Sequence, residues 1–167
     1  VGGNNKINMK ELAAAFSDAG FSDVRTYINS GNVIFSGEAG VSATQAICKG
    51  LILQRFGLDI AVAVLAASEL VDALANAPDW WGKAPDAKHN AIFVIAPATA
   101  EALFDDVGEI KPEYEKAAYH GNIIFWTAPP ATLSRTQWFA ASSQKAISRK
   151  ITIRNHNTAY KLAELAK

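Results

Sequence analysis

The stretch from Arg25 to Ser36 constrains the fold most, because it predicts a β-hairpin. Val24–Ile28 and Val33–Phe35 are rich in the β-branched and aromatic residues that favour strands. Asn29–Asn32 lies between them with the sequence Asn-Ser-Gly-Asn, which is typical of a turn, and Gly31 suits the positive φ that such turns need. The first half of the chain is therefore expected to contain a two-stranded antiparallel ribbon.

Predicted helices flank this hairpin. Asn8 is a suitable N-cap for a helix that ends at Gly20, and a second helix is expected over Ser42–Phe56. An apolar strand is expected over Ile60–Leu65. Because a glycine-rich loop such as residues 2–6 normally follows a strand, we expect a further strand upstream that this sequence lacks. With that strand the order is βαββαβ, the ferredoxin-like split unit.

The second half of the chain gives the same order of elements. Residues 90–96 form an apolar run that predicts a strand, and residues 99–107 predict a short helix. The other elements expected are a hairpin over Tyr114–His120 and Asn122–Thr127, a helix over Ser134–Gln144, a strand over Lys150–Ile153 and a terminal helix over Asn155–Lys167. We therefore predict an α+β fold of two small ferredoxin-like lobes, the first without its first strand in this sequence.

Residues 78–89 are the predicted connector between the lobes. This segment holds two prolines and a glycine, which interrupt regular structure, together with Trp80 and Trp81. The predicted division is an N-terminal α+β lobe over residues 1–77, the connector, and a C-terminal α+β lobe with the terminal helix over residues 90–167. With Trp126 and Trp138, the paired tryptophans provide either a stacking platform for a base or sugar or packing between the lobes.

Composition indicates a folded chain, since 50% of the residues are hydrophobic and 19% are charged. The longest apolar runs fall far short of the roughly 20 residues that a membrane-spanning helix needs, so no membrane partner is expected. Cys48 is the only cysteine, which excludes an intrachain disulfide and suits the reducing cytoplasm. Its apolar neighbours Ile47, Leu51 and Ile52 predict a buried thiol on a helix rather than a nucleophile.

Three polar stretches fall at the ends of predicted elements, where loops carry binding groups. The first is the loop of Gly2, Gly3, Asn4, Asn5 and Lys6, whose backbone N–H groups and cation suit an anion. The second is the hairpin turn with its flanks, namely Arg25, Tyr27, Asn29, Ser30 and Asn32. The third begins the terminal helix and consists of Arg154, Asn155, Asn157 and Thr158, where the positive end of the helix dipole favours an anion.

Each stretch also has a structural interpretation. The Gly2–Lys6 loop has neither Walker nor GxGxxG spacing, so no nucleotide cofactor is predicted and a plain connection is the alternative. Strand alternation places Arg25, Tyr27 and Asn29 on one polar face. The alternative there is that the Asn and Ser side chains satisfy the turn's own backbone while the other two face solvent. In the third stretch, one of the Asn or Thr residues is otherwise the helix cap.

The histidines, His89, His120 and His156, have no metal-ligand spacing, so no metal site is predicted. The leading functional hypothesis is a small-molecule or anion-binding module whose site is formed by the three polar stretches. Nucleic-acid binding is second and less favoured: no acid interrupts the cations from Arg135 to Lys161, but the predicted strands show no aromatic RNA-binding motif. An enzyme of unknown class is third, with His156 or Lys6 as the first suspects.

Several segments resemble a bacterial protein family. They are Gly2–Ile7, Thr26–Val33 with its Tyr-Ile-Asn-Ser-Gly-Asn motif, Pro78–Gly82, Lys88–Phe93, Ile124–Trp126, Thr152–Asn155 and Asn157–Thr158. Together they are similar, over essentially the whole chain, to the family catalogued as domain of unknown function 1697. The resemblance implies a compact α+β fold of two subdomains, without an established activity or cofactor. It also implies an upstream strand ending in Leu-Leu-Arg-Gly-Ile-Asn, and a Trp or Ala at position 156, which argues against a catalytic His156.

Overall fold

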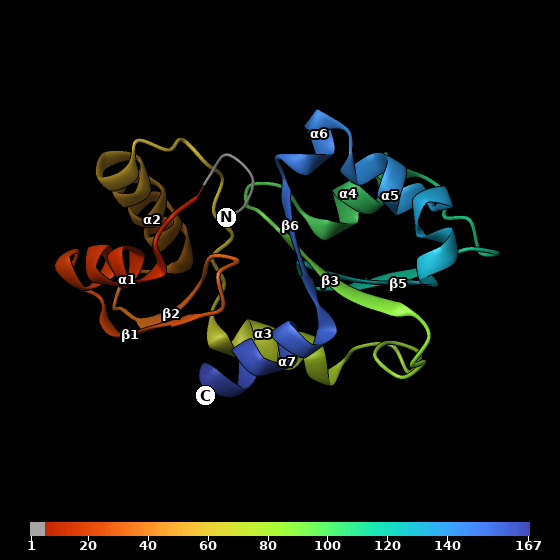
Figure 1. Ribbon diagram of the computed structural model, residues 1–167, viewed down its shortest axis with the longest axis horizontal. Helices are drawn as coiled ribbons and strands as arrows, with labels where there is room; N and C mark the ends of the chain where they lie inside the picture. Colours follow the sequence, from red (N-terminus) through yellow and green to blue (C-terminus); the bar gives the residue numbers. More distant parts are fainter. Residues whose placement is uncertain (1–5) are drawn as a thin grey trace. The chain divides into compact units, whose positions relative to one another are not determined.

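The computed structural model describes residues 6–167, which divide into two compact units (Figure 1). Unit 1 consists of the chain up to residue 66 together with residues 162–167, and unit 2 consists of residues 67–161. The segment that sequence analysis placed at the end of the first lobe, from residue 67 onward, thus belongs to unit 2. Each unit has a hydrophobic core of its own.

Unit 1 consists of a hairpin and two helices. Its elements are α1 (Met9–Asp18), β1 (Ser22–Tyr27), β2 (Asn32–Ser36) and α2 (Val41–Phe56). Leu12 and Phe16 lie one turn apart on α1, and Cys48 and Ile52 lie one turn apart on α2, so both pairs face the same core. The ring of Phe16 packs 5.1 Å from that of Phe35 on β2. The predicted burial of the Cys48 thiol is confirmed.

The hairpin turn lies one residue earlier than predicted. Tyr27 pairs with Asn32 across the ladder, so the turn is Ile28–Gly31 rather than Asn29–Asn32. Both ends of this turn, Ile28 and Gly31, have a positive φ, of 50° and 86°. The physical reason lies in Asn32, whose Nδ2 donates to the Tyr27 carbonyl at 3.0 Å and so holds Asn32 in the strand rather than in the turn.

The predicted strand over Ile60–Leu65 is wrong, because residues 57–66 form no strand. Ile60, Val62 and Val64 do pack against the core, as alternation requires of an extended segment with one apolar side. A strand also needs a ladder partner, and the sheet of unit 1 contains β1 and β2 within the described residues. Here the Val62 carbonyl instead accepts a hydrogen bond from the Gln45 side chain at 3.1 Å.

Unit 2 is built on a four-stranded sheet with order β4-β5-β3-β6, in which every neighbouring pair is antiparallel. Its elements are α3 (Ala67–Ala75), β3 (Lys88–Val94), α4 (Ala100–Val107), β4 (Lys116–His120), β5 (Ile123–Ala128), the 3-10 helix η1 (Pro130–Arg135), α5 (Gln137–Ser142), α6 (Lys145–Ser148), β6 (Ile151–Asn155) and the start of α7 (His156–Leu165). The predicted hairpin of β4 and β5 and the α+β class are confirmed.

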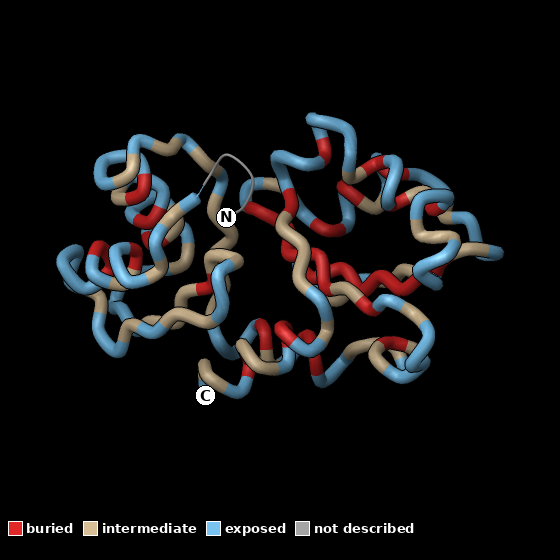
Figure 2. Tube along the Cα trace, in the orientation of Figure 1, coloured by how far each residue is buried: buried red, intermediate tan, exposed pale blue. Residues whose placement is uncertain are grey.

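One face of this sheet carries the main core of unit 2. Ile92 on β3 and Ile124 and Trp126 on β5 pack there against Leu103 of α4 and Trp138 of α5. Figure 1 shows α4, α5 and α6 on this side of β3. Figure 2 shows that β3 is buried along nearly its whole length, so the sheet is covered on its other face as well.

The second face presents the alternate side chains, because successive residues of a strand point to opposite sides. His89 and Ala91 of β3 lie on this face, and Phe125 of β5 pairs directly with Ala91. The ring of Phe125 packs edge-on at 4.9 Å against Trp81, from the segment between α3 and β3. α3 and the start of α7 also lie on this side (Figure 1). Arg154 of β6 shares this face, because it pairs with Ala91.

The single helix predicted over Ser134–Gln144 is instead divided among η1, α5 and α6. Thr136 makes the division. Its Oγ1 donates to the Leu133 carbonyl at 2.7 Å and accepts from the Phe139 N–H at 3.1 Å, so it ends η1 and caps α5. Side-chain hydrogen bonds therefore override the continuous helical pattern at this point.

A buried carboxylate supports the same helix start. Glu115 is 3% exposed and accepts three backbone N–H bonds, from Lys111 at 3.1 Å, Gln137 at 2.5 Å and Trp138 at 3.2 Å. Negative charge at a helix N-terminus is favourable, because the unpaired N–H groups there carry partial positive charge. Glu115 thus joins the loop before β4 to α5.

Candidate functional site

The first polar stretch lies mostly outside the described residues. This holds for Gly2, Gly3, Asn4 and Asn5, whereas Lys6 is described and exposed. The adjoining Asn8 is confirmed as the N-cap of α1, since its Oδ1 accepts from the N–H groups of Lys10 at 2.9 Å and Glu11 at 3.2 Å. Two donors at this helix start are therefore used within the chain.

Three residues of the second stretch, Arg25, Ser30 and Asn32, make hydrogen bonds within unit 1. Arg25 donates through its guanidinium to the carbonyl of Leu165, in the part of α7 that belongs to unit 1. Asn32 donates to Ser30 Oγ at 2.9 Å as well as to the Tyr27 carbonyl. The predicted common face of Arg25, Tyr27 and Asn29 ends at Tyr27, because Ile28 turns into the left-handed region and breaks the strand alternation.

The third stretch forms the junction of β6 and α7. Asn155 ends β6, and its Oδ1 accepts from the Thr158 N–H at 2.8 Å, so Asn155 is the cap among the three candidates. Thr158 is buried, whereas Asn157 is exposed. The N-terminal N–H groups of His156 and Asn157 precede the capped one and have no intrahelical acceptor by the geometry of a helix.

Arg154 keeps its guanidinium close to its own strand. Its Nη1 donates to Thr152 Oγ1 and to the Ile153 carbonyl, each at 2.9 Å. Burial lowers the pKa of Arg154 from its ordinary value, because the charged form loses hydration. The group stays protonated at neutral pH, so unit 2 holds a partly desolvated positive charge on the second face of its sheet.

His156 is held by rings rather than by hydrogen bonds. Its ring centroid lies 5.3 Å from that of His89 and 6.0 Å from that of Trp81, both edge to face. A Cβ added at Gly82 would lie 3.5 Å from His156 Cδ2, so the backbone also passes close by. Within residues 6–167, neither ring nitrogen of His156 makes a hydrogen bond.

His89 differs, because both of its ring nitrogens are engaged. It is 3% exposed, and Nε2 lies 2.8 Å from the Ala84 carbonyl while Nδ1 lies 2.8 Å from Thr127 Oγ1. A carbonyl only accepts, so Nε2 carries a hydrogen and donates it to Ala84. The His89 ring is therefore held in place and packs against His156. The sequence pattern did not indicate this role for His89.

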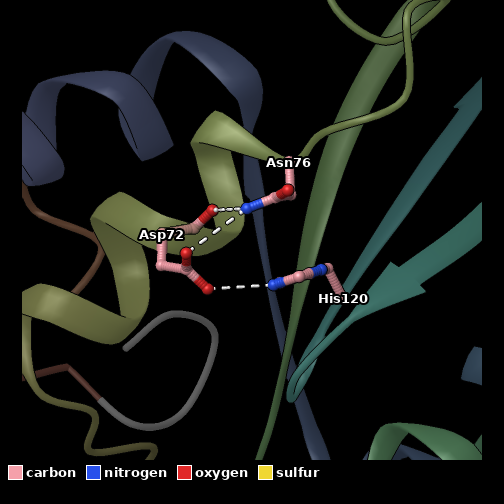
Figure 3. A network of polar contacts seen from close by, with 3 residues as sticks. All are labelled: Asp72, Asn76 and His120. Carbon is pink, nitrogen blue, oxygen red and sulfur yellow. Dashed lines mark hydrogen bonds and ion pairs between the residues drawn. The ribbon is translucent and has the colours of Figure 1, made fainter.

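A second polar cluster of unit 2 escaped sequence analysis altogether. Figure 3 shows Asp72 of α3 facing His120 at the end of β4, while Asn76, the residue after α3, points its amide toward Asp72. Asp72 Oδ2 lies 2.9 Å from His120 Nε2, and Asn76 Nδ2 donates to Asp72 Oδ1 at 3.3 Å and to the Asp72 carbonyl at 2.9 Å. No spacing signal links these residues, because 48 positions separate the aspartate from the histidine.

The structure assigns the predicted site residues to different units. Lys6 and the hairpin residues belong to unit 1, whereas Arg154–Thr158 belong to unit 2. Within unit 2, the third stretch gathers with His89 and Trp81, and we call Arg154–Thr158 with these two residues the β6–α7 corner. The described residues contain no group of three side chains suited to hold a metal ion. They also contain no helix with the length and apolar character needed to cross a bilayer.

Comparisons with known proteins identify a family but not an activity. One similar solved structure is that of the conserved bacterial protein SP0830 from Streptococcus pneumoniae, which is 25% identical with a TM-score of 0.86 over 100% of this chain and 93% of that chain. No curated protein matches. Residues 1–125 match the model described as "Protein of unknown function (DUF1697)". This match spans most of the sequence, so the chain belongs to the DUF1697 family.

Proposed function

We propose that this protein is a small-molecule-binding module and that it binds an anionic group at the β6–α7 corner. The main support is the environment of His156. Neighbouring rings fix the orientation of its imidazole, and its ring nitrogens make no hydrogen bond within residues 6–167. A neutral imidazole offers one donor and one acceptor, and a protonated one offers two donors. Such a ring can bind a polar ligand atom without first breaking a hydrogen bond to another residue of the described chain.

The helix start adds an anion preference to this ring. α7 contains 10 residues, and Asn155 uses the N–H of Thr158. The preceding N–H groups, of His156 and Asn157, lie at the positive end of the helix dipole. A carboxylate or phosphate oxygen at this end would accept from them, as anions at helix N-termini commonly do.

Arg154 strengthens the same preference through charge. A positive charge that has lost part of its hydration interacts more strongly with an anion than one in bulk water, because the local dielectric constant is lower. Its contacts with Thr152 and Ile153 hold the guanidinium on β6, the strand that leads into α7.

Calorimetric titration with inorganic phosphate, pyrophosphate and citrate tests the proposal. At least one should bind the wild-type protein, and His156→Ala should raise its Kd about tenfold, the loss of one charge-assisted hydrogen bond. His120→Ala is the matched control, because it removes another partly exposed histidine of unit 2, and it should bind as wild type. Arg154→Gln should also weaken binding, whereas Arg149→Gln, an exposed arginine just before β6, should not.

The proposal fails if none of the three anions binds, or if His156→Ala and Arg154→Gln both bind as tightly as wild type. The other predicted contributors are tested separately, since they belong to unit 1. Lys6→Ala and Asn29→Ala report on the Gly2–Lys6 loop and on the hairpin turn. If only these two variants lose binding, the anion binds in unit 1 rather than at the β6–α7 corner.

The strand order supports a ferredoxin-like assignment for unit 2, which we include in the proposal. In chain order its strands are β3, β4, β5 and β6, and β3 lies between the third and the fourth of them. α4 connects the first to the second, and η1, α5 and α6 connect the third to the fourth. This is the arrangement expected when a βαββαβ unit forms one antiparallel sheet.

A further inference from the structure

His156 combines a fixed ring with open nitrogens. The ring packs edge to face against His89 of β3 and against Trp81, and the backbone at Gly82 lies beside it. The residue is only partly buried, so solvent and small solutes can reach it. Within residues 6–167, neither ring nitrogen makes a hydrogen bond or an ion pair. A proton or an anion can therefore bind at these nitrogens without displacing another described residue.

The neighbouring imidazole is in the opposite situation. His89 is 3% exposed, and its two ring nitrogens already contact the Ala84 carbonyl and the Thr127 hydroxyl. Of these two imidazoles, His156 is the one with a nitrogen open both to a new proton and to a solute. A change of charge that accompanies ligand binding is therefore assigned to His156.

The surroundings of His156 offer its charged form no acidic partner. The ionisable residues of the elements around it, besides His89, are Glu69 and Asp72 on α3, Asp79, Lys83 and Asp86 in the segment between α3 and β3, Lys88 on β3, Arg154 on β6, and Tyr160, Lys161 and Glu164 on α7. None of them forms an ion pair with His156 in the described part of the chain, and Asp72 is paired with His120.

Arg154 adds positive charge to the same corner. It lies two residues before His156, and burial lowers its pKa from the ordinary value without removing its charge at neutral pH. A nearby cation disfavours a second positive charge, whereas an anion favours one. Protonation of His156 is thus opposed when no anion is bound and favoured when one is bound.

We propose that anion binding at the β6–α7 corner is coupled to protonation of His156, an inference that rests on the proposed function. The anion and the proton each make binding of the other more favourable, and by linkage the two effects are equal in size. The proton comes from solvent and turns the acceptor nitrogen of the ring into a second donor. The corner thus binds its ligand in mildly acidic solution and releases it as the pH rises.

The sign and size of the pH dependence follow from this coupling. Histidine side chains commonly change charge between about pH 5 and about pH 8. Protonated His156 adds one charge-assisted hydrogen bond to an anion oxygen, which corresponds to about a tenfold lower Kd. Binding to the neutral ring alone would give no such increase in affinity at acidic pH.

Calorimetric titration of the full chain with sulfate, at about pH 5.5 and about pH 8, tests the coupling. Sulfate keeps its double negative charge over this range, so a change in affinity comes from the protein. The Kd of wild type should be about tenfold lower at the acidic pH. Titrations near neutral pH in two buffers with different enthalpies of ionisation should also show that the protein takes up protons on binding.

His156→Gln isolates the contribution of the imidazole. Glutamine retains a neutral donor and acceptor, but it takes up no proton in this range. The Kd of this variant should change by less than about threefold between the two pH values, and its proton uptake should be smaller than that of wild type. His120→Gln is the matched control, because it removes another partly exposed histidine of unit 2, and it should retain the tenfold change.

A wild-type Kd that is equal at both pH values would overturn the coupling and leave anion binding itself in place. A tenfold change that His156→Gln retains would have the same meaning. Failure of sulfate to bind at either pH would also overturn the coupling. The anion site is tested separately with phosphate, pyrophosphate and citrate, so the two proposals can fail independently.

Discussion

Arg25 on β1 donates a hydrogen bond from its guanidinium to the backbone carbonyl of Leu165, the last residue of α7. The last carbonyls of a helix have no intrahelical donor, and positive charge there is favourable. Arg25 is therefore a helix-end contact within unit 1 rather than a free member of the predicted polar site.

This contact predicts a local loss of stability in Arg25→Ala. Removing a cation from a helix C-terminus costs on the order of 0.5–1 kcal/mol. The amides of residues 162–167 should exchange faster with solvent, as measured by hydrogen exchange, while those of α1 keep their rates. Lys10→Ala, which removes an exposed cation from α1, is the control. Unchanged exchange at residues 162–167 would contradict the role.

Glu115 is predicted to contribute more to the free energy of unfolding than a residue in a loop usually does. Glu115→Ala leaves three backbone donors without their carboxylate, at Lys111, Gln137 and Trp138, in a site closed to water. Unsatisfied buried donors cost about 1–3 kcal/mol each, part of which local rearrangement recovers, so we expect a loss of about 3 kcal/mol. Urea unfolding measures it. Glu113→Ala, at an exposed neighbour, should change stability by less than about 0.5 kcal/mol.

Cys48 links stability to alkaline pH. Burial raises the pKa of its thiol from 9.0 to about 11. Between these values the unfolded chain has lost the proton while the folded chain retains it. The stabilisation from the neutral thiol is therefore complete below pH 9 and is lost as pH rises toward 11. Cys48→Ala should show a smaller fall in the free energy of unfolding over this window than wild type.

The same burial predicts the reactivity of the thiol. The thiolate is the reactive form, so iodoacetamide should modify the native protein slowly at neutral pH and the urea-unfolded protein readily. Rapid modification of the native chain at pH 7 would show that Cys48 is accessible and would contradict its buried position.

The pair of Asp72 and His120 is predicted to contribute little to folding. Their side chains are 66% and 41% exposed, and ion pairs in such surroundings contribute at most about 1 kcal/mol. A double-mutant cycle with Asp72→Ala and His120→Ala should give a coupling free energy within that limit, which added salt reduces. A coupling well above about 2 kcal/mol would assign the cluster a structural role that its exposure does not predict.

Local patterns predicted most of the regular elements. The caps at Asn8 and Asn155, the burial of Cys48 and the hairpin of β4 and β5 all follow from short-range chemistry that one segment carries by itself. The predictions were wrong where a partner distant in sequence, or a side-chain hydrogen bond, determines the secondary structure. Within residues 6–167 the extended segment around Val62 has no ladder partner, and Thr136 divides a pattern that is otherwise continuous.

The candidate site was less accessible to sequence reasoning than the fold. Arg25 was chosen for its polar neighbours on the strand, but its partner is Leu165, and 140 positions separate them. His89 and Trp81 surround His156 because the sheet register and the segment between α3 and β3 bring them together. Neither residue spacing nor composition predicts such long-range contacts, because they depend on strand pairing and on the packing of helices against the sheet.

Binding at the β6–α7 corner is tested most directly by two-dimensional ¹H–¹⁵N NMR of the wild-type protein during titration with pyrophosphate. We predict that the NMR signals of the backbone amides of His156 and Asn157 and of the ring nitrogens of His156 shift progressively and saturate together. The ring nitrogens of His120, at the other cluster of unit 2, should not move. Shifts that leave out His156 and Asn157, or no saturable shift at all, would contradict anion binding at the β6–α7 corner.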